Sequence, residues 1–598
     1  NILQAARATG AGAIHPGYGF LSEREAFSAA VQEAGLTFIG PDPFSIEAMG
    51  NKSASKIRMI AAGVPCVPGY QGDDQSDDTL VAEAKKAGLP VMVKAAAGGG
   101  GRGMRLVHDE ADLLAGIQSA RSEASNAFGD GQLLIEKAVL NARHVEIQVF
   151  GDRHGNVVHL GERDCSVQRR NQKVVEEAPS PAVDEDLRAR MGAAAVAAAK
   201  AVNYVGAGTV EFMLAADGAF YFLEMNTRLQ VEHPVTELVY DVDLVEWQLR
   251  VAQGEPLPMT QEAIDARRKG WAIEVRLCTE DPAQNFMPQT GPLLAWRAPA
   301  GAGMRVDHGL RQGGVISPFY DSMQAKLIAV GATREQARHK LLQMLDETVL
   351  LGVSSNRDFL AQIVAHPVFA DGRFSTGFIA EHFPAETISA SREPDSLHVA
   401  LAAALLYRTA ADALQASAGI ESELLNWQSS APAAVLFRLK AGEKVFDIKV
   451  KALSAGRYEV MLPDATKVIE LTSLGAPDLR YLCDGIAGRA SFALAGDTLW
   501  LSHGGLTLAY RDTTLAAAEK GAAGSDGRLV APMDGKIVAV MVEAGAAIIK
   551  GQTLAVLEAM KMEFPIASAV DGLVEVVSCQ PGQQVKARSL LIGLKPTA

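Results

Sequence analysis

The sequence predicts a multidomain protein of the α/β and β classes, and three observations support this prediction. A chain of 598 residues is long enough for about four domains of ordinary size. Residues 1–385 alternate short apolar runs with helical stretches, which is typical of an α/β architecture. Residues 434–511 contain short alternating runs separated by Gly, Asp and Ser, and residues 528–598 contain an internal repeat, so we expect both segments to be β-structure.

Composition and charge are those of an ordinary globular protein. Hydrophobic residues make up 48% of the chain and charged residues 21%, which is far from the composition of disordered segments. The net charge of -14 argues against nucleic acid as a partner. The sequence shows no uninterrupted apolar run of about 20 residues, so we expect no membrane partner either.

The cysteines and the first residue bear on the compartment. The five cysteines are far apart and show no paired spacing, so we expect neither a disulfide framework nor a zinc site. A reducing compartment follows, either the bacterial cytoplasm or the mitochondrial matrix. Because the sequence starts at Asn1, inside an αβ pattern, we expect that the natural N-terminus and any targeting peptide are absent from it.

The first structural signal in residues 1–385 is a strand over Leu89–Lys94 that runs into the glycine-rich stretch Ala95–Met104. The stretch contains a literal G-x-G-x-x-G, but it lacks the strand–turn–helix context of a dinucleotide site and the Gly-Lys-Ser/Thr ending of a P-loop. We expect instead a mobile lid whose backbone N–H groups close over phosphates, with Lys94 adding positive charge.

The next elements are a strand over Arg143–Gln148 and an Ala-rich helix over Asp186–Val202. The alternation in the strand places polar side chains on one face and apolar side chains on the core face. The polar face carries His144, Glu146 and Gln148, and the core face carries Val145 and Ile147.

Two further strand-like runs flank Asp217-Gly218, a strong signal for a two-residue hairpin turn. Glu211 lies six residues before this turn and Glu224 six residues after it, so we expect their carboxylates to face each other about 5 Å apart. Like charges so placed are destabilising unless a cation lies between them. With Asn226 on the same face, the oxygen-rich set favours Mg²⁺ or Mn²⁺. A slipped register would instead leave both glutamates solvated.

The middle of the chain predicts a helix followed by a small β-domain. Residues 386–397 are polar and contain proline, as in a linker, and His398–Gly419 has the pattern of an apolar, Ala-rich helix. Strands expected at Lys444–Ser454, Arg457–Leu462 and Leu499–His503 suggest a small antiparallel barrel or sandwich. Residues 512–527 have the composition of a flexible linker.

Residues 528–598 repeat themselves with a period of 37 residues. The equivalent pairs are Gly535 and Gly572, Gly545 and Gly582, and Leu554 and Leu591. Neither half can bury its apolar face alone, so we expect the halves to pack together as a flattened β-sandwich with pseudo-twofold symmetry. Lys561 lies between the halves, bracketed by Met560 and Met562, where an exposed turn is expected.

This repeat and the tetrapeptide Ala559-Met560-Lys561-Met562 together resemble the biotinyl domain of biotin-dependent carboxylases, in which the tetrapeptide is the attachment motif. The lipoyl domain has the same shape, but its lysine usually follows Asp rather than Met. The resemblance implies biotin bound covalently to Lys561, and therefore a biotin–protein ligase as a partner. A turn lysine extended by biotin can swing between two active sites at a high effective concentration.

Residues 1–383 resemble the ATP-grasp biotin carboxylases, through the glycine-rich stretch and the blocks His15–Glu23 and Glu224–Pro234. By position in the family motifs, the resemblance implies ATP contacts at Lys52, Lys94, Gly98, Gly99, Gly100, Gly101, Glu136, Lys137, His144 and Gln168. It also implies two Mg²⁺ or Mn²⁺ ions, held by Glu211, Glu224 and Asn226. Asn171 stands where the family commonly has His, and Asn can hydrogen-bond there but cannot carry a charge.

The block Glu224–Pro234 is polar in a region otherwise rich in core residues, and its resemblance implies the chemistry. The catalytic and bicarbonate-binding positions that it and the flanking motifs imply are Lys173, Arg228, Gln230, the backbone of Val231, Glu232 and Arg276. Glu232 matches the general base that deprotonates bicarbonate, and Arg228 matches the cation that stabilises the anion. Together they would turn bicarbonate into a nucleophile for the γ-phosphate of MgATP.

These resemblances imply the α-subunit of a hetero-oligomeric acyl-CoA carboxylase of the 3-methylcrotonyl- or geranyl-CoA type. No carboxyltransferase segment is visible, so we expect a carboxyltransferase β-subunit as partner in an α6β6-type assembly. Residues 386–511 resemble the domain that docks this subunit. Three alternatives stay open: the α-subunit of a propionyl- or acetyl-CoA carboxylase, another ATP-grasp ligase joining a carboxylate to an amine, and a non-enzymatic biotin carrier scaffold.

Overall fold

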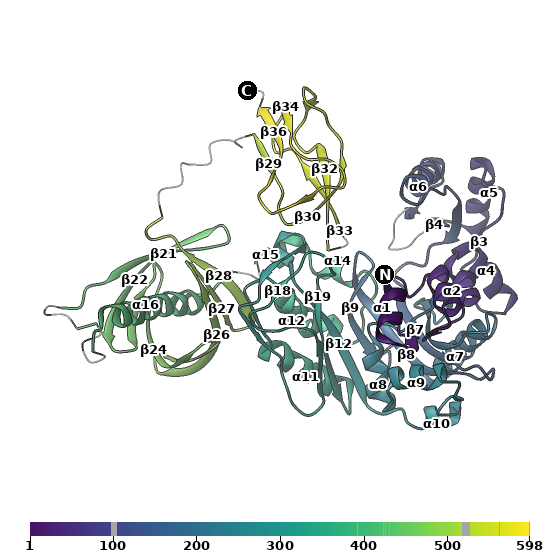
Figure 1. The fold of residues 1–598 in the computed structure, drawn as a ribbon, viewed down its shortest axis with the longest axis horizontal. Helices are drawn as coiled ribbons and strands as arrows, with labels where there is room; N and C mark the ends of the chain where they lie inside the picture. The colour runs from purple at the N-terminus through teal and green to yellow at the C-terminus, as the bar shows by residue number, and fades with distance from the viewer. Residues whose placement is uncertain are drawn as a thin grey trace.

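The computed structural model describes residues 1–96, 104–390, 393–421, 431–516, 527–560 and 562–596, together with residues 424, 426, 427 and 429. The chain forms three bodies: a large α/β body, a β-barrel that packs around a helix, and a small β-sandwich (Figure 1). Gly98, Gly99, Gly100, Gly101 and Lys561, which the sequence predicts to bind ATP and biotin, lie outside the described residues.

An eight-stranded sheet forms the centre of the α/β body, in the order β11-β10-β7-β8-β9-β12-β19-β17. Its strands are β7 (Arg143–Gly151), β8 (Val157–Arg169), β9 (Gln172–Ala178), β10 (Gly206–Leu214), β11 (Phe220–Asn226), β12 (Trp271–Cys278), β17 (Met304–His308) and β19 (Met323–Gly331). All neighbours run antiparallel. The alternation of strands and helices in the sequence therefore does not produce a parallel sheet, because short hairpins join several neighbouring strands.

Helices cover the sheet and short strands extend the α/β body. The helices after residue 180 are α7 (Glu185–Lys200), α8 (His233–Tyr240), α9 (Leu244–Ala252), α10 (Gln261–Asp265), α11 (Arg334–Glu347), α12 (Arg357–Ala365), α13 (Pro367–Ala370), α14 (Phe378–His382) and α15 (Ala385–Ala390). The short strands there are β13 (Glu280–Asp281), β14 (Met287–Pro288), β15 (Gly291–Pro292), β16 (Ala295–Arg297), β18 (Val315–Ile316) and β20 (Val349–Leu351).

A smaller four-stranded sheet, β3-β6-β4-β5, forms a separate unit above one end of the large sheet (Figure 1). Its elements are β3 (Gly69–Tyr70), α5 (Asp77–Ala87), β4 (Val91–Ala95), β5 (Met104–Val107), α6 (Leu113–Phe128) and β6 (Leu133–Lys137). The first elements of the chain are α1 (Ile2–Thr9), β1 (Ala13–Ile14), α2 (Glu25–Glu33), β2 (Thr37–Phe38), α3 (Pro43–Gly50) and α4 (Lys52–Ala61). The unit built on the four-stranded sheet has its own buried core, so it can hold Lys94 at the end of the rigid strand β4.

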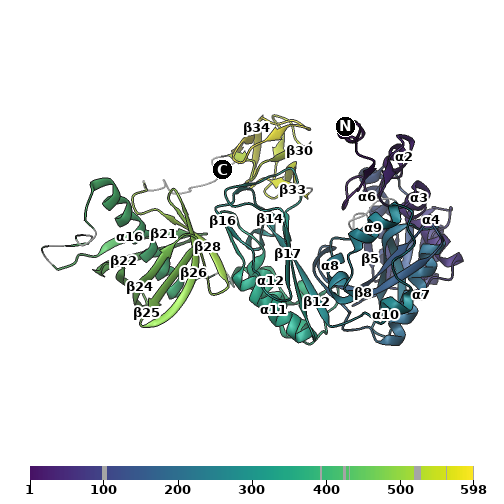
Figure 2. The same ribbon diagram turned by 60° about the horizontal axis from the view of Figure 1, so that its bottom comes forward.

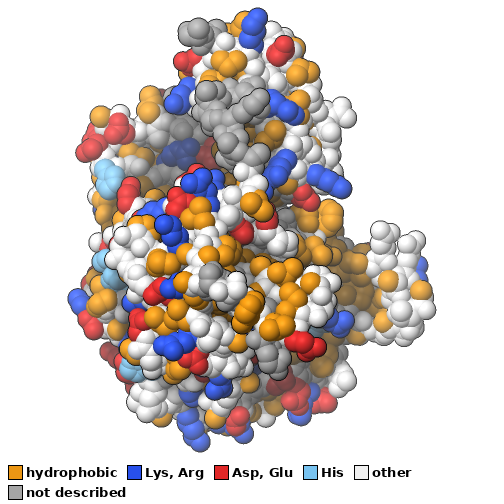
Figure 3. All heavy atoms as spheres, turned by 90° about the vertical axis from the view of Figure 1, so that its left-hand side faces the viewer, with side chains coloured by type: hydrophobic (Ala, Val, Ile, Leu, Met, Phe, Trp, Pro, Cys, Tyr) orange, Lys and Arg blue, Asp and Glu red, His pale blue; other side chains and the backbone are white. Residues whose placement is uncertain are grey.

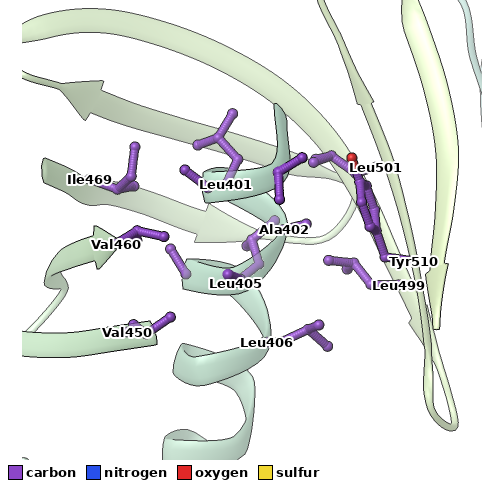
Figure 4. Packing of buried hydrophobic residues seen from close by; sticks show 14 of the residues in the cluster. Leu401, Ala402, Leu405, Leu406, Val450, Val460, Ile469, Leu499, Leu501 and Tyr510 are labelled. Atoms are coloured by element: carbon purple, nitrogen blue, oxygen red, sulfur yellow. The ribbon is translucent and has the colours of Figure 1, made fainter. Parts of the chain in front are cut away.

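The second body is a closed eight-stranded barrel that packs around helix α16 (Ser396–Ala418). The strands are β21 (Val435–Ala441), β22 (Lys444–Ser454), β23 (Arg457–Met461), β24 (Thr466–Gly475), β25 (Asp478–Cys483), β26 (Ile486–Ala495), β27 (Thr498–His503) and β28 (Leu506–Asp512). Figure 4 shows Leu401 and Leu405 of the helix packing against Val460 and Ile469 of the barrel. The predicted β-domain is therefore a barrel rather than a sandwich.

Helix α16 passes the length and composition test for a membrane span, the one helix among the described residues that does so. Half of the most apolar 18-residue stretch of this helix is buried inside the structure, and the side chains of Val399 to Leu406 belong to the barrel core. The helix begins two residues before the predicted His398, because Asp395 accepts a hydrogen bond from the His398 N–H at 2.7 Å and caps it. Its apolar character is therefore explained by the barrel.

The third body is a sandwich of two four-stranded sheets, β29-β36-β34-β31 and β33-β32-β30-β35. Its strands are β29 (Arg528–Val530), β30 (Gly535–Val540), β31 (Ala547–Ile548), β32 (Thr553–Ala559), β33 (Met562–Ala567), β34 (Gly572–Val577), β35 (Gln584–Val585) and β36 (Leu590–Pro596). Each sheet takes two strands from each half of the repeat, since β29 and β31 pair with β36 and β34, and β33 and β35 pair with β32 and β30. This exchange explains why neither half can fold alone.

Two glycines at equivalent positions of the repeat, Gly535 and Gly572, each allow a neighbouring backbone to approach closely. A Cβ on Gly535 would lie 2.6 Å from the Glu558 carbonyl oxygen, and a Cβ on Gly572 would lie 2.4 Å from that of Lys595. Both separations are too short for any side chain, so the close approach of the two backbones requires glycine. The predicted symmetry of the sandwich is therefore present down to single residues.

Candidate active site

Glu211 and Glu224 are register partners on β10 and β11, as the sequence predicts. The turn itself is not the predicted two-residue turn. Ala215 N–H donates to the Ala219 carbonyl at 2.8 Å, and Gly218 at φ 82° closes a three-residue loop. Residues near this loop pair one position out of step, and a bulge between Glu211 and Phe212 restores the expected pairing. Because a glycine in the left-handed region favours this longer loop, the prediction of the turn is wrong and that of the pair is confirmed.

Cationic and amide groups of the chain surround the two carboxylates. Asn226 Nδ2 donates to Glu211 Oε1 at 2.8 Å, His144 Nε2 lies 2.9 Å from Glu211 Oε2, and Lys52 Nζ lies 3.6 Å from Glu224 Oε2. Burial would lower the pKa of His144, but the Glu211 carboxylate raises it above the ordinary value. Burial raises the pKa of Glu224, and the facing charge of Glu211 raises it further.

This set of side chains fits a divalent cation. Two carboxylates and an amide oxygen are the hard ligands that Mg²⁺ and Mn²⁺ prefer. A carboxyl whose pKa is raised by a facing carboxylate gains most from a positive charge between them. His144, Glu146 and Glu211 also bring their ligand atoms within 4.8 Å of one another, which extends the oxygen-rich region towards β7.

Lys173 on β9 connects this pair to the rest of the site. Its Nζ lies 2.5 Å from Glu146 Oε2, 3.0 Å from Glu211 Oε1 and 2.7 Å from Glu232 Oε1. Burial would lower the pKa of Lys173, but the three carboxylates hold it well above the ordinary value. The lysine is therefore a fixed positive charge at the centre of the cluster.

The hairpin between β8 and β9 sets the position of Lys173. Gln168 is its register partner, and the two-residue turn between them is formed by Arg170 and Asn171 at φ 49° and 65°. Asn is among the residues that tolerate this left-handed conformation. Asn171 therefore suits the turn that positions Lys173, whatever its own contacts.

Glu232 is fully buried at the N-terminal end of α8. Besides Lys173, it accepts a hydrogen bond from Arg276 Nη2 at 2.9 Å. Burial would raise the pKa of Glu232, but Lys173 and Arg276 hold it well below the ordinary value. Arg276 also donates from Nε to Glu176 at 2.6 Å, and burial raises the pKa of Glu176 to about 7.

Arg228 is held in place by three side-chain oxygen atoms. It donates to Glu23 Oε2 at 2.9 Å, to Gln230 Oε1 at 2.8 Å and to Asn226 Oδ1 at 3.2 Å. Glu23 comes from the block His15–Glu23, so the first residues of the chain take part in ordering the guanidinium. The Val231 carbonyl accepts a hydrogen bond from Lys326 Nζ at 2.8 Å, which fixes the backbone after Gln230.

The predicted nucleotide residues are only partly brought together. Lys94 Nζ lies 2.5 Å from Glu136 Oε2, and Lys56 Nζ lies 2.8 Å from Glu136 Oε1. Burial would raise the pKa of Glu136, but the two lysines lower it to about 2. Lys137, in contrast, donates to the carbonyls of Gly88 and Leu89, so its ammonium supports the loop before β4.

Several residues without a predicted role contact the predicted site residues: Glu23, Lys56, Glu146, Arg163, Glu176 and Lys326. Arg163 is the largest fully buried side chain among the described residues, with Nε 2.6 Å from Glu146 Oε1 and Nη1 2.8 Å from Gln148 Oε1. A signal was present, because Glu162-Arg163-Asp164 is a charged run inside a long strand, where charges are retained only if paired.

Models of four protein families match the chain. The model described as "Carbamoyl-phosphate synthase L chain, ATP binding domain" matches residues 51–260, and the biotin carboxylase N-terminal and C-terminal domains match residues 1–46 and 274–381. The model described as "Biotin-requiring enzyme" matches residues 527–594.

Curated relatives match over nearly the whole chain. Methylcrotonoyl-CoA carboxylase subunit alpha from Dictyostelium discoideum is 43% identical over 99% of this chain and 86% of its own length. The corresponding rat protein is 42% identical over 99% of this chain and 84% of its own length. The propionyl-CoA carboxylase alpha chain of Ruegeria pomeroyi is 40% identical over 99% of this chain and 90% of its own length.

Solved structures match the α/β body. The biotin carboxylase domain of 2-oxoglutarate carboxylase from Hydrogenobacter thermophilus, in complex with MgADP, ADP and bicarbonate, is 47% identical with a TM-score of 0.61. Biotin carboxylase from Campylobacter jejuni is 44% identical, also with a TM-score of 0.61. Each match covers 64% of this chain and 84% of the solved chain.

Proposed function

This chain belongs to the family of biotin-containing acyl-CoA carboxylase α-subunits, and from that premise we propose how its residues carry out the reaction. The function is the ATP- and bicarbonate-dependent carboxylation of biotin on the chain's own carrier sandwich, an ATP-dependent ligase activity. One observation carries the proposal for the site: Lys173 joins the Glu211–Glu224 pair, which suits a metal-bound triphosphate, to Glu232, which suits a general base.

Glu232 takes the proton from bicarbonate. Its low pKa keeps it ionised at neutral pH, so the group is always in the basic form. Lys173 contacts both Glu232 and Glu211, and when phosphate oxygens enter the site they compete for the same ammonium. The pKa of Glu232 then rises and its basicity with it.

Arg228 stabilises the bicarbonate anion. Its guanidinium is already ordered by Glu23 and Gln230, so little side-chain entropy is lost when bicarbonate binds. A bicarbonate oxygen attacks the γ-phosphorus of ATP, the bond to the bridging oxygen breaks, and ADP leaves with the electron pair. Lys94 on the small sheet and Lys52 on α4 supply positive charge to the phosphates.

Two bound groups complete the site. Glu211, Glu224 and Asn226 would hold two Mg²⁺ or Mn²⁺ ions, which would supply positive charge to offset that of the phosphates. Biotin on Lys561 would supply the ureido nitrogen that takes up the carboxyl group, and the phosphate released at the same time would take the proton of that nitrogen. Arg276 lies beside Glu232 on β12, where it can hold the anionic oxygen atoms that gather near the base. His144, Gln168 and Glu136 would contact the nucleotide.

The second half of the reaction needs a carboxyltransferase β-subunit, which α-subunits of this family imply. Figure 3 shows the end of the molecule formed by the barrel, where apolar side chains lie among charged ones. Large apolar side chains of the barrel that are exposed include Leu436, Val445, Leu453, Ile486 and Leu494. We propose this surface as the β-subunit docking site, in an α6β6-type assembly.

The acyl-CoA and the compartment follow from the relatives. Methylcrotonoyl-CoA carboxylase α-subunits are the more similar relatives, which favours 3-methylcrotonyl-CoA or geranyl-CoA over propionyl-CoA or acetyl-CoA. A biotin–protein ligase must modify Lys561. The eukaryotic relatives are named as mitochondrial, so a eukaryotic chain would act in the matrix and a bacterial one in the cytoplasm.

Two measurements test this proposal. In the first, carboxylation of free biotin is followed with Glu232→Gln and Arg228→Ala, and ATP binding is measured in parallel. We expect carboxylation to be abolished with ATP binding largely retained, and normal turnover in either variant would refute the assignment. In the second, the biotinylated chain with its β-subunit is offered a panel of acyl-CoAs. Failure of free-biotin carboxylation in the unaltered chain would favour a scaffold, and amine-dependent ATP cleavage would favour another ATP-grasp ligase.

A further inference from the structure

The carrier sandwich lies against the α/β body in both ribbon views (Figures 1 and 2). Met560, the residue before Lys561, is 3% exposed. Its backbone N–H donates to the Pro318 carbonyl at 3.3 Å, in the loop between β18 and β19. The residue therefore leaves the core of its own domain and enters that of another.

The pocket that receives Met560 is apolar and belongs wholly to the α/β body. Its other buried residues are Leu277, Leu293, Ile316, Ala325, Leu350 and Val353. Met560 has φ 49°, a conformation that side chains rarely adopt outside turns. The turn is therefore shaped to present this side chain outwards.

A second methionine makes the opposite contact. Met287 on β14, in the α/β body, packs against the core of the carrier sandwich. Met560 of the carrier thus packs into a core cluster of the α/β body, and Met287 of the α/β body packs against the core of the carrier. Methionine is flexible and polarisable, so it suits a surface that must bind and release repeatedly.

The pocket lies directly behind the active site. Leu277 and Ala325 are register partners on β12 and β19, and so are Arg276 and Lys326, the neighbouring pair. Because side chains alternate between the faces of a sheet, the first pair faces Met560 and the second faces Glu232 and Val231. The carrier therefore packs on the opposite face of the strands that carry the catalytic arginine.

The segment that carries Met287 also reaches the hairpin of Lys173. Asn285 accepts a hydrogen bond from Arg170 Nη2 at 3.1 Å, and the Arg169 guanidinium lies 3.9 Å from the centroid of the Phe286 ring. Asn285, Phe286 and Met287 are consecutive residues, so the two contacts with the β8–β9 hairpin adjoin the contact of Met287 with the carrier. Met287, which contacts the carrier, therefore directly follows Phe286, which packs against Arg169 beside the β8–β9 turn.

We propose that Met560 and Met287 form a reciprocal docking contact that seats the carrier sandwich for the biotin-carboxylation half of the reaction. The inference rests on the proposed function, and it adds the surface and the two positioning residues. Both methionines act by placing the carrier rather than by touching the reacting atoms.

The test uses the full biotinylated chain without its β-subunit and compares carboxylation of its own biotin with that of added free biotin. Met287→Asn and Met560→Asn are expected to slow carboxylation of the tethered biotin about tenfold, as loss of an interface hot spot does. Free biotin should be carboxylated at the unaltered rate. Met560→Leu, which conserves volume and apolarity, should restore most of the loss.

Controls separate docking from other effects. Met541→Asn changes a methionine of the same domain that is 62% exposed, and it should have no effect. Biotin occupancy of Lys561 is measured by mass spectrometry for every variant, because Met560 adjoins it. A second readout needs no biotin: in the unmodified chain, amide hydrogen exchange over residues 314–322 should accelerate in Met560→Asn and Met287→Asn.

The outcomes are distinct for the two proposals. Equal rates on tethered biotin in all variants, at full occupancy, overturn the docking contact and leave the proposed function intact. Unchanged hydrogen exchange in both Asn variants also overturns the contact. Absence of carboxylation with free biotin in the unaltered chain overturns the proposed function instead.

Discussion

Glu176 and Glu232 share one guanidinium, because Arg276 donates from Nε to Glu176 at 2.6 Å and from Nη2 to Glu232 at 2.9 Å. Their pKa values differ. Burial opposes ionisation of both, but Lys173 and Arg276 hold the pKa of Glu232 well below its ordinary value. Burial raises the pKa of Glu176 to about 7. One carboxyl is a permanent anion, and the other changes charge near neutral pH.

Glu176→Gln should remove a pH-dependent part of the stability. The pKa of Glu176 rises from 4.5 to about 7 on folding, so between these values the folded state binds more protons than the unfolded state. Stability therefore falls as the pH rises through this window, by roughly 3 kcal/mol for a fully buried group. Unfolding temperatures at pH 5 and pH 8 measure the fall. The variant should lack it, whereas Asp447→Asn, at an exposed barrel carboxylate, should behave as the unaltered chain. Parallel profiles for Glu176→Gln and the unaltered chain would contradict this account.

Arg163→Met should destabilise the α/β body strongly. The guanidinium is fully buried and lies 2.6 Å from Glu146, so its removal leaves a buried carboxylate that has lost one of two cations. Breaking a buried pair in this way costs about 3–5 kcal/mol. Urea unfolding followed by circular dichroism measures the loss. The double change Arg163→Met with Glu146→Leu should recover part of it, and wild-type stability in the single variant would show that Lys173 alone suffices for Glu146.

Features that depend on local patterns could be predicted from the sequence. The 37-residue repeat predicts the carrier sandwich, because each half exposes an apolar face that only the other half can cover. Alternation places His144, Glu146 and Gln148 on one face of β7, and their contacts with Glu211 and Arg163 agree. Equal spacing from a turn predicts the Glu211–Glu224 pair, although the loop is longer than predicted and a bulge compensates for it.

Contacts between distant strands could not be predicted in this way. Lys173 brings together carboxylates from β7, β10 and the start of α8, and neither periodicity nor spacing carries information on which strands become neighbours. The fully buried Arg163 illustrates the same limit, since the charged run Glu162–Asp164 indicates that the arginine needs a partner but not that Glu146 supplies it. Met560 is another case, because the sequence suggests an exposed turn and the structure buries its side chain in a second domain.

Glu224→Gln should separate metal binding from stability. The pKa of Glu224 is raised by burial and by the facing Glu211, so the neutral amide relieves repulsion in the metal-free chain. The unfolding temperature without divalent cations should therefore rise slightly. The Mg²⁺ concentration needed for half-maximal ATP cleavage should rise about tenfold or more, because one anionic ligand is lost. A lower unfolding temperature with unchanged Mg²⁺ dependence would assign Glu224 to structure rather than to the metal.

Leu405→Ala should weaken the barrel without touching the chemistry. Leu405 is fully buried between α16 and the barrel strands, and Figure 4 shows it among the core side chains around Ala402 and Leu406. Truncation of a buried leucine costs about 2–5 kcal/mol. Leu414→Ala, on the same helix but 59% exposed, is the matched control and should cost little.

The readout for Leu405→Ala distinguishes the bodies of the chain. Free-biotin carboxylation depends on the α/β body and should stay unchanged, whereas acyl-CoA carboxylation with the β-subunit should fall, because a loosened barrel presents a less ordered docking surface. Assembly measured by size-exclusion chromatography should fall in parallel. A loss of free-biotin carboxylation in Leu405→Ala would mean that the barrel also supports the catalytic body, through contacts such as Arg357 Nη1 with Ser502 at 2.9 Å. Full assembly and full acyl-CoA carboxylation in a measurably destabilised barrel would place the β-subunit elsewhere on the chain.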